Sequence, residues 1–151
     1  VISVLSILPG VIFTYLLPQD ASGKSTGKLK IYTVLGSVIL AIFGIFLVPI
    51  LLPIVFPEYV DSLSLIPILS ISLIPSTVAS IFTSKFLSKE KSSYVLIGHI
   101  LGVISLILGI MILTDIYDVS GLAISYVLSI SVQAGFLTVA YVIKKKSLGE
   151  K

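Results

Sequence analysis

Long uninterrupted runs of apolar residues, separated by short polar segments, dominate the chain. Four of these runs reach the roughly 20 residues that cross the hydrocarbon core of a bilayer, and the run at the N-terminus is slightly shorter. Apolar side chains occupy all sides of each run, without the period-two alternation of membrane barrel strands. Because a helix satisfies its backbone hydrogen bonds within one segment, the pattern predicts about five transmembrane helices, the first one partial. They lie near residues 1–17, 29–56, 62–84, 92–114 and 119–143.

The composition agrees with a chain surrounded by lipid. Of the 151 residues, 56% are hydrophobic and 11% are charged, against roughly 25% charged residues in soluble domains. We therefore expect an all-α integral membrane protein that crosses the cell membrane several times. The chain opens at Val1 inside an apolar run, without the basic segment or cleavage site of a signal peptide, so we expect a portion of a longer protein.

Several classes of chemistry are not expected from this composition. The chain has no cysteine and a single histidine, which excludes disulfides, thiolate metal sites and histidine-rich metal sites. Clustered cations with aromatic platforms, which a nucleic-acid surface requires, do not occur. We expect no metal, no cofactor and no nucleic-acid partner.

The lysines are distributed unevenly between the polar segments. Segments 18–30, 57–61, 85–91, 115–118 and 144–151 hold three, zero, three, zero and four lysines, and the two lysine-free segments are acidic. Lysine-rich short loops face the cytoplasm according to the positive-inside rule. The pattern therefore predicts that the basic loops and the tail 144–151 are cytoplasmic and that the acidic loops are external.

Prolines fall inside two of the expected spans. Pro49 and Pro53 lie in the second span, and Pro67 and Pro75 lie in the third. Each proline removes a backbone donor and clashes with the preceding helical turn. The prolines are either packing kinks, in which neighbouring helices satisfy the freed carbonyl groups, or hinges of a helix that bends during transport.

Small residues recur at helical spacing in the fourth and fifth spans. These ladders consist of Gly98, Gly102, Ser105 and Gly109 in one span, and Gly121, Ser125 and Ser129 in the other. Small side chains let helix backbones approach closely when lipid provides no hydrophobic drive for association. We expect the ladders to pack the two spans together across the 115–118 turn; dimerisation is the alternative.

A row of hydroxyl side chains follows the third span at a strict four-residue step. The row contains Ser72, Ser76, Ser80 and Ser84 and is flanked by Thr77 and Thr83. One interpretation is functional: these side chains line a hydrated cavity through which a polar substrate moves. The alternative is that the hydroxyls bond back to carbonyl groups four residues earlier and only pack.

His99 and Gln133 are the strongly polar side chains inside the expected spans. Ionisable groups within a membrane are frequently functional, so these residues are candidates for a proton or polar relay. A neutral imidazole that bonds a carbonyl group across the Gly98 and Gly102 contact is the alternative. The spans contain no carboxylate, and the serines have no neighbouring base in the sequence, so we expect no catalytic residues and no enzyme.

Four passages resemble one family of transporters. Leu52-Pro-Ile-Val-Phe-Pro-Glu-Tyr59 leads into Leu65-Ile-Pro-Ile-Leu69 and is similar to the helix, Phe-Gly-x-x-Tyr, helix passage of lipid-linked oligosaccharide flippases. Phe86-Leu-Ser-Lys-Glu-Lys91 resembles their short basic loop, and Val119-Ser-Gly-Leu-Ala-Ile-Ser125 resembles a helix opening of the family. The family is the polysaccharide (O-antigen-type) transporters of the multidrug/oligosaccharidyl-lipid/polysaccharide exporter superfamily. Pro57 stands where the family more often has Gly, and 120–125 is poorer in alanine, so no subfamily is assigned.

The resemblance implies a place within a larger transporter. Residues 1–151 would form the C-terminal transmembrane portion of a two-lobed exporter with 12 to 14 helices that works by alternating access. Its substrate would be a lipid-linked sugar chain, moved from the cytoplasmic to the outer leaflet. The cations that bind the substrate pyrophosphate in this family have no counterpart inside these spans, so we expect them in the N-terminal lobe of the same protein.

Three other functions stay open at the level of sequence. A multidrug cation antiporter has the same architecture but usually requires acidic residues within the membrane. A membrane-embedded glycosyl- or acyltransferase requires His, Asp or Glu at the interface, and Asp115 and Asp118 are explained better by turn solvation. A non-transporting membrane partner subunit requires only the packing ladders.

The alternation of lysine content makes the orientation testable. We expect positions 24, 89 and 145 to face the cytoplasm and positions 58 and 118 to face outward. Single cysteines introduced at these positions report the orientation, because the chain has no native cysteine. A membrane-impermeant thiol reagent added to intact cells should label only positions 58 and 118. Labelling at 89 with protection at 118 would contradict the orientation.

Overall fold

Helices account for nearly all of the residues that the computed structural model of the chain describes. These are residues 27–55 and 63–144, with residues 7, 10, 11, 14, 15, 17–19 and 22 before them. Most of the expected first span, the loop 57–61 and the tail beyond Lys144 lie outside them. The helices are α2 (Gly27–Phe46), α3 (Val48–Val55), α4 (Leu65–Ile71), α5 (Leu73–Ser88) and α6 (Ser92–Lys144). No strand occurs among the described residues, which confirms the all-helical expectation for them.

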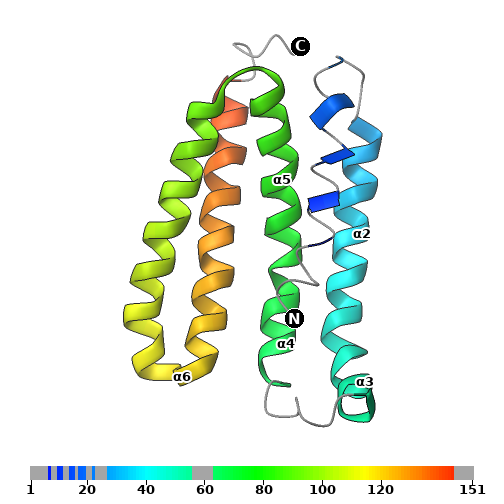
Figure 1. Cartoon of the computed structure of the whole chain (residues 1–151), viewed down its shortest axis with the longest axis vertical. Coiled ribbons are helices and arrows are strands. Elements are labelled where there is room, and N and C mark those ends of the chain that lie inside the picture. The colour runs from blue at the N-terminus through cyan, green and yellow to red at the C-terminus, as the bar shows by residue number, and fades with distance from the viewer. Residues whose placement is uncertain are drawn as a thin grey trace.

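The segment named α6 is a helical hairpin. Its backbone is helical throughout except at Asp118, where φ is 48° and ψ is −128°. These angles are close to those of the first central residue of a type II′ turn, which reverses the chain. A first arm (92–117) and a second arm (119–144) therefore lie antiparallel (Figure 1). Gly121 allows this tight reversal, because a Cβ there would collide with the carbonyl oxygen of Leu113.

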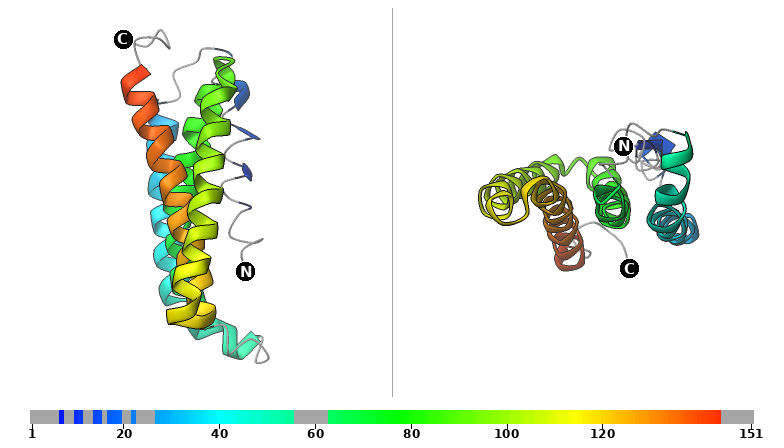
Figure 2. Two further views of the ribbon diagram at one scale, coloured as in Figure 1. Left: turned by 90° about the vertical axis from the view of Figure 1, so that its left-hand side faces the viewer. Right: turned by 90° about the horizontal axis from the view of Figure 1, so that it is seen from below.

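Prolines coincide with the interruptions of the other expected spans. Pro75 cannot donate a hydrogen bond to the carbonyl group of Ile71, and the helix is interrupted at Ser72, between α4 and α5. Pro49 likewise cannot donate to Ile45, and the chain turns at Leu47, between α2 and α3. Figure 2 shows α3 leaving the axis of α2 at this point.

The other two candidate hinge prolines lie inside short helices. Pro67 occupies the first turn of α4, where its missing N–H removes no helical hydrogen bond. Pro53 lies within α3. The described interruptions are thus associated with Pro49 and Pro75, and a hinge motion stays a prediction at all four positions.

A short turn connects α5 to α6. Glu90 adopts a positive φ of 56°, and the N–H of Lys91 donates to the carbonyl oxygen of Phe86 at 2.9 Å. The N–H of Glu90 donates to Leu87 at 3.0 Å, which completes the pair of bonds of a Schellman motif. The last carbonyl groups of α5 are satisfied, and the chain returns at once into the first arm of α6.

The helices stand side by side, with α4 and α5 in the centre. α5 contacts α2 on one side and α6 on the other, and α4 makes the same two contacts (Figure 1). The largest buried cluster lies between α5 and the second arm, where Phe86 and Leu137 are fully buried with Ala79, Ala134 and Ala140. The rings of Phe86 and Tyr94 stack with centroids 5.1 Å apart, which joins the first arm to this cluster.

Two helical segments are long and apolar enough to cross a membrane. They are Leu65–Ser88, which combines α4 and α5, and Ser92–Lys144; the apolar part of α2, Lys30–Phe46, is shorter. The hairpin is largely exposed, and large side chains such as Met111, Val142 and Ile143 are about two-thirds exposed. Apolar surface of this extent is compatible with lipid rather than water as its surroundings.

The described charges gather at opposite ends of the helices. The described lysines belong to the start of α2, the end of α5, the turn that follows and the end of α6, which Figure 1 shows together. Asp115 and Asp118 lie at the reversal of α6, at the other end. Glu90 is the one described acid at the basic end. The side of the membrane that each end faces stays a prediction.

A close approach of the two arms away from the reversal can be tested at Gly109. A Cβ there would lie 2.9 Å from Ser125 Oγ and 3.0 Å from Ser125 Cβ. We expect Gly109→Leu to force the arms apart and to lower the free energy of unfolding by ~1–3 kcal/mol. Gly135→Leu is the matched control on the same hairpin, because a Cβ at Gly135 meets no atom within 4 Å. Thermal unfolding in detergent measures both, and equal effects would contradict the close contact.

Candidate functional site

Polar side chains from α5 and from both arms of α6 line one pocket. Ser76, Ser80 and Thr83 come from α5, His99 comes from the first arm and Gln133 comes from the second. The pocket has a volume of about 340 Å³, and Ala79, Ile130 and Gly10 complete its lining. We call it the polar pocket. Two of the sequence-predicted groups, the hydroxyl row and the pair of relay candidates, are thus partly brought together.

His99 and Gln133 contact each other across the hairpin. His99 Nδ1 lies 2.8 Å from the carbonyl oxygen of Val95, one turn earlier, and Gln133 Nε2 lies 3.3 Å from His99 Nε2. With the ring proton assigned to Nδ1, the imidazole donates to Val95, and Gln133 Nε2 lies at nearly the same distance from Nδ1, 3.4 Å, as from Nε2. The arrangement fixes the ring at the edge of the polar pocket, so both the relay and the simple packing interpretation stay open.

The hydroxyl row divides into two groups. Ser76 and Ser80 line the polar pocket, whereas Ser72, Thr77 and Ser84 are buried between helices. The physical reason is that each four-residue step advances about 40° beyond a full turn, so the row winds off a single helix face. Of the candidate cavity-lining residues, the structure therefore places only Ser76 and Ser80 on the polar pocket, and it adds Thr83.

The buried hydroxyls have different surroundings. Ser72 Oγ donates to the carbonyl oxygen of Leu69 at 2.6 Å, at the interruption between α4 and α5. Thr77 Oγ1 is buried and has no hydrogen-bond partner. A buried hydroxyl without a partner costs about 1–3 kcal/mol, so Thr77 is a packing position with an energetic penalty.

The small-residue ladders lie at the contact between the arms. A Cβ at Gly98 would lie 3.3 Å from the side chain of Leu137, and a Cβ at Gly102 would lie 3.5 Å from Gln133 Cβ. Ser129 Oγ donates to the carbonyl oxygen of Gly102 at 2.8 Å, which is a direct hydrogen bond between the arms. Ser125, which faces Gly109, donates within its own arm to Gly121 at 2.7 Å. The polar pocket therefore lies beside the contact that Gly102 makes with Ser129 and Gln133.

A third ladder of small residues, in α2, was not predicted from the sequence. Ser37, Ala41 and Gly44 of α2 are buried against the centre of the bundle. A Cβ at Gly44 would collide with the side chain of Ser70 in α4. The small residues at spacings of four and three within the second span were the available signal.

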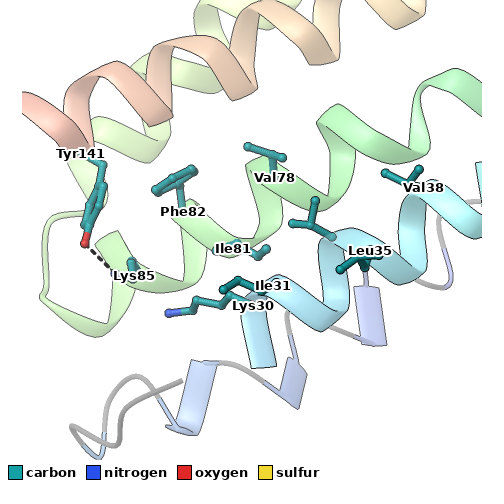
Figure 3. A pocket seen from close by; sticks show the side chains of 10 residues that line it. Lys30, Ile31, Leu35, Val38, Val78, Ile81, Phe82, Lys85 and Tyr141 are labelled. Atoms are coloured by element: carbon teal, nitrogen blue, oxygen red, sulfur yellow. Dashed lines mark hydrogen bonds between the residues drawn. The ribbon is translucent and has the colours of Figure 1, made fainter. Parts of the chain in front are cut away.

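A second pocket lies on the other side of α5 and was also not expected. It lies between α2, α5 and the end of α6 and has a volume of about 500 Å³. Its walls are apolar, and its polar side chains are Lys30, Lys85 and Tyr141 (Figure 3). We call it the lysine-ended pocket. The lysine content of the polar segments predicted the orientation of the chain, but it did not indicate that Lys30 and Lys85 border a cavity.

The side chains of the described residues limit the ligands that the polar pocket can hold. These residues contain no group of three or more His, Cys, Asp or Glu side chains that could hold a metal ion. The polar pocket is lined by hydroxyl, amide and imidazole groups and no carboxylate. Such a lining can exchange hydrogen bonds with water or with sugar hydroxyl groups, and it cannot hold a cation by charge.

A double-mutant cycle tests whether His99 and Gln133 couple the arms. Hydrogen bonds between helices in lipid are worth ~0.6 kcal/mol on average, up to ~1.7. We expect His99→Phe, Gln133→Leu and the double variant to give a coupling energy in this range, measured by unfolding in detergent. Ser131→Ala and His99→Phe form the control pair, because Ser131 bonds within its own arm. A coupling energy no larger than that of the control pair would show that the contact contributes nothing.

Comparison with known proteins places the chain in no family. No protein-family model, no curated protein and no solved structure matches it. The function of the chain is therefore inferred from the geometry of the polar pocket and from the resemblance of the quoted passages to flippases.

Proposed function

We propose that the chain is the C-terminal portion of a multi-pass membrane transporter that moves lipid-linked oligosaccharide or polysaccharide precursors across the cytoplasmic membrane by alternating access. The observation that carries the proposal is the polar pocket, in which five polar side chains from three helical segments converge within apolar stretches. In a membrane, polar groups are retained where they face water, protein or a polar substrate.

The chemistry of the polar pocket suits a sugar better than a cation. Ser76, Ser80 and Thr83 provide hydroxyl groups that both donate and accept hydrogen bonds, and Gln133 provides an amide. A sugar chain presents the same kinds of group. A multidrug cation antiporter would use membrane-embedded acids, and the pocket lining has none.

The position of the pocket also supports a transport path. Ser76 and Ser80 lie near the middle of Leu65–Ser88, the segment that combines α4 and α5, and Gln133 lies near the middle of the second arm. Transporter substrate sites are commonly found near the bilayer midplane, where helices are interrupted. The interruption at Ser72 lies one turn from Ser76. In the proposed cycle this part of the chain forms one wall of the cavity, and the N-terminal lobe forms the other.

Filling the polar pocket tests the proposal. We expect Ser76→Leu with Ser80→Leu to obstruct the passage, so that cells lacking the parent protein make no more surface polysaccharide with this variant than without it. The same variant should insert and accumulate normally. Surface glycan and membrane abundance, measured together, separate the two effects.

Two matched variants serve as controls. Ser76→Ala with Ser80→Ala leaves space in the pocket and suits a helix, so it should keep activity. Thr77→Val replaces a buried hydroxyl outside the pocket and should also keep activity. An abundant and fully active double Leu variant would refute the passage. If the double Leu variant lost resistance to cationic drugs while surface polysaccharide stayed unchanged, the result would favour the antiporter.

A further inference from the structure

We propose that the lysine-ended pocket binds an anionic phospholipid of the membrane, with the acyl chain between α2 and α5 and the phosphate at Lys30 and Lys85. The proposal requires that the chain lies in a bilayer, and it does not depend on transport. A pocket of about 500 Å³ falls within the ~300–1,000 Å³ of ligand sites in proteins.

The pocket is divided into an apolar part and a cationic end. Its apolar lining is formed by Ile31, Val34, Leu35 and Val38 of α2 and by Val78, Ile81 and Phe82 of α5. These residues extend over about two helical turns, or ~10 Å along the axis. Lys30, Lys85 and Tyr141 lie together at one end, and Val38 lies at the other (Figure 3).

The cationic end is held in place by contacts within the protein. Lys85 Nζ donates to Tyr141 Oη at 2.7 Å and lies 4.3 Å from the centre of the Tyr141 ring. Tyr141 also packs against Phe82, with ring centroids 5.1 Å apart. A phosphate at this end would accept hydrogen bonds from lysine and tyrosine groups that the fold has already oriented.

The position along the helices matches the depth of a lipid headgroup. Lys30 is in the first turn of α2, Lys85 is in the last turn of α5, and Tyr141 is in the last turn of α6. Lysine and tyrosine are typical of the membrane interface, and basic pockets between membrane helices bind anionic headgroups. The apolar part points from this end towards the middle of the helices, as an acyl chain does in its leaflet.

Other occupants fit this pocket less well. Free inorganic phosphate would use the cationic end and leave the apolar part empty. A peptide would bring backbone groups that need partners, and the walls between Ile31 and Phe82 are helices whose backbone groups are already bonded. A phospholipid satisfies both parts of the pocket at once.

The test counts lipids retained by the purified protein. We expect native mass spectrometry to show one retained phosphatidylglycerol and much weaker retention of phosphatidylcholine with the same acyl chains. Each lysine contributes about fivefold to the attraction of an anionic surface, so Lys30→Gln with Lys85→Gln should weaken phosphatidylglycerol binding ~30-fold. Lys30→Gln alone should weaken it ~5-fold, and this variant keeps the Lys85–Tyr141 contact intact.

Two further variants separate the pocket from general attraction. Lys28→Gln with Lys89→Gln removes two exposed lysines from the same end, outside the pocket lining, and should leave binding of one lipid in place. Val34→Phe fills the apolar part, keeps every charge and should abolish retention of that lipid, with helix content by circular dichroism unchanged. Equal weakening by both lysine pairs, or full retention by Val34→Phe, would overturn the proposal. If glycerol phosphate displaced the retained phosphatidylglycerol as effectively as whole lipid does, the proposal would be overturned in favour of a free phosphate. Selective retention of a prenyl phosphate would overturn it in favour of that lipid.

Discussion

Close approach of helix backbones is the constraint on which the whole arrangement depends. Helices in an apolar environment gain little from burying more apolar surface, so packing at short range and hydrogen bonds between helices hold them together. Gly109 faces Ser125, Gly44 faces Ser70, and the hydroxyl of Ser129 bonds the backbone of Gly102. These contacts fix the two arms of α6 to each other and α2 to α4.

The position of α5 between two tightly packed neighbours produces two different pockets. On the α6 side, hydroxyl groups of α5 meet His99 and Gln133 in the polar pocket, away from the helix ends. On the α2 side, apolar walls end at two lysines and a tyrosine at the basic end of the bundle. One pocket offers hydrogen bonds without charge, and the other offers charge at the end of an apolar space. Their proposed ligands, a sugar chain and an anionic phospholipid, differ for this reason.

Interruptions of the helices are located by a few residues with specific backbone requirements. Pro49 and Pro75 remove donors and coincide with the breaks at Leu47 and Ser72. Asp118 adopts the positive φ that reverses the hairpin. The reversal keeps the two arms adjacent, and adjacency is what allows Gln133 to reach His99 across 34 positions of sequence.

Hydropathy alone determined that the described chain is helical. The distribution of the lysines anticipated that basic and acidic residues gather at opposite ends of the helices. Both properties could be read from the sequence because they depend on residues that are close together in it. The glycine and serine ladders of residues 98–129 were visible for the same reason. Only the tertiary structure decided which of Ser72, Ser76, Thr77, Ser80 and Ser84 share a pocket, since a four-residue step winds around the helix and the neighbouring helix selects the face. Only the tertiary structure brought Lys30 to the same pocket as Lys85 and Tyr141, because that meeting depends on how α2 packs against α5, a contact that no local pattern of lysines records.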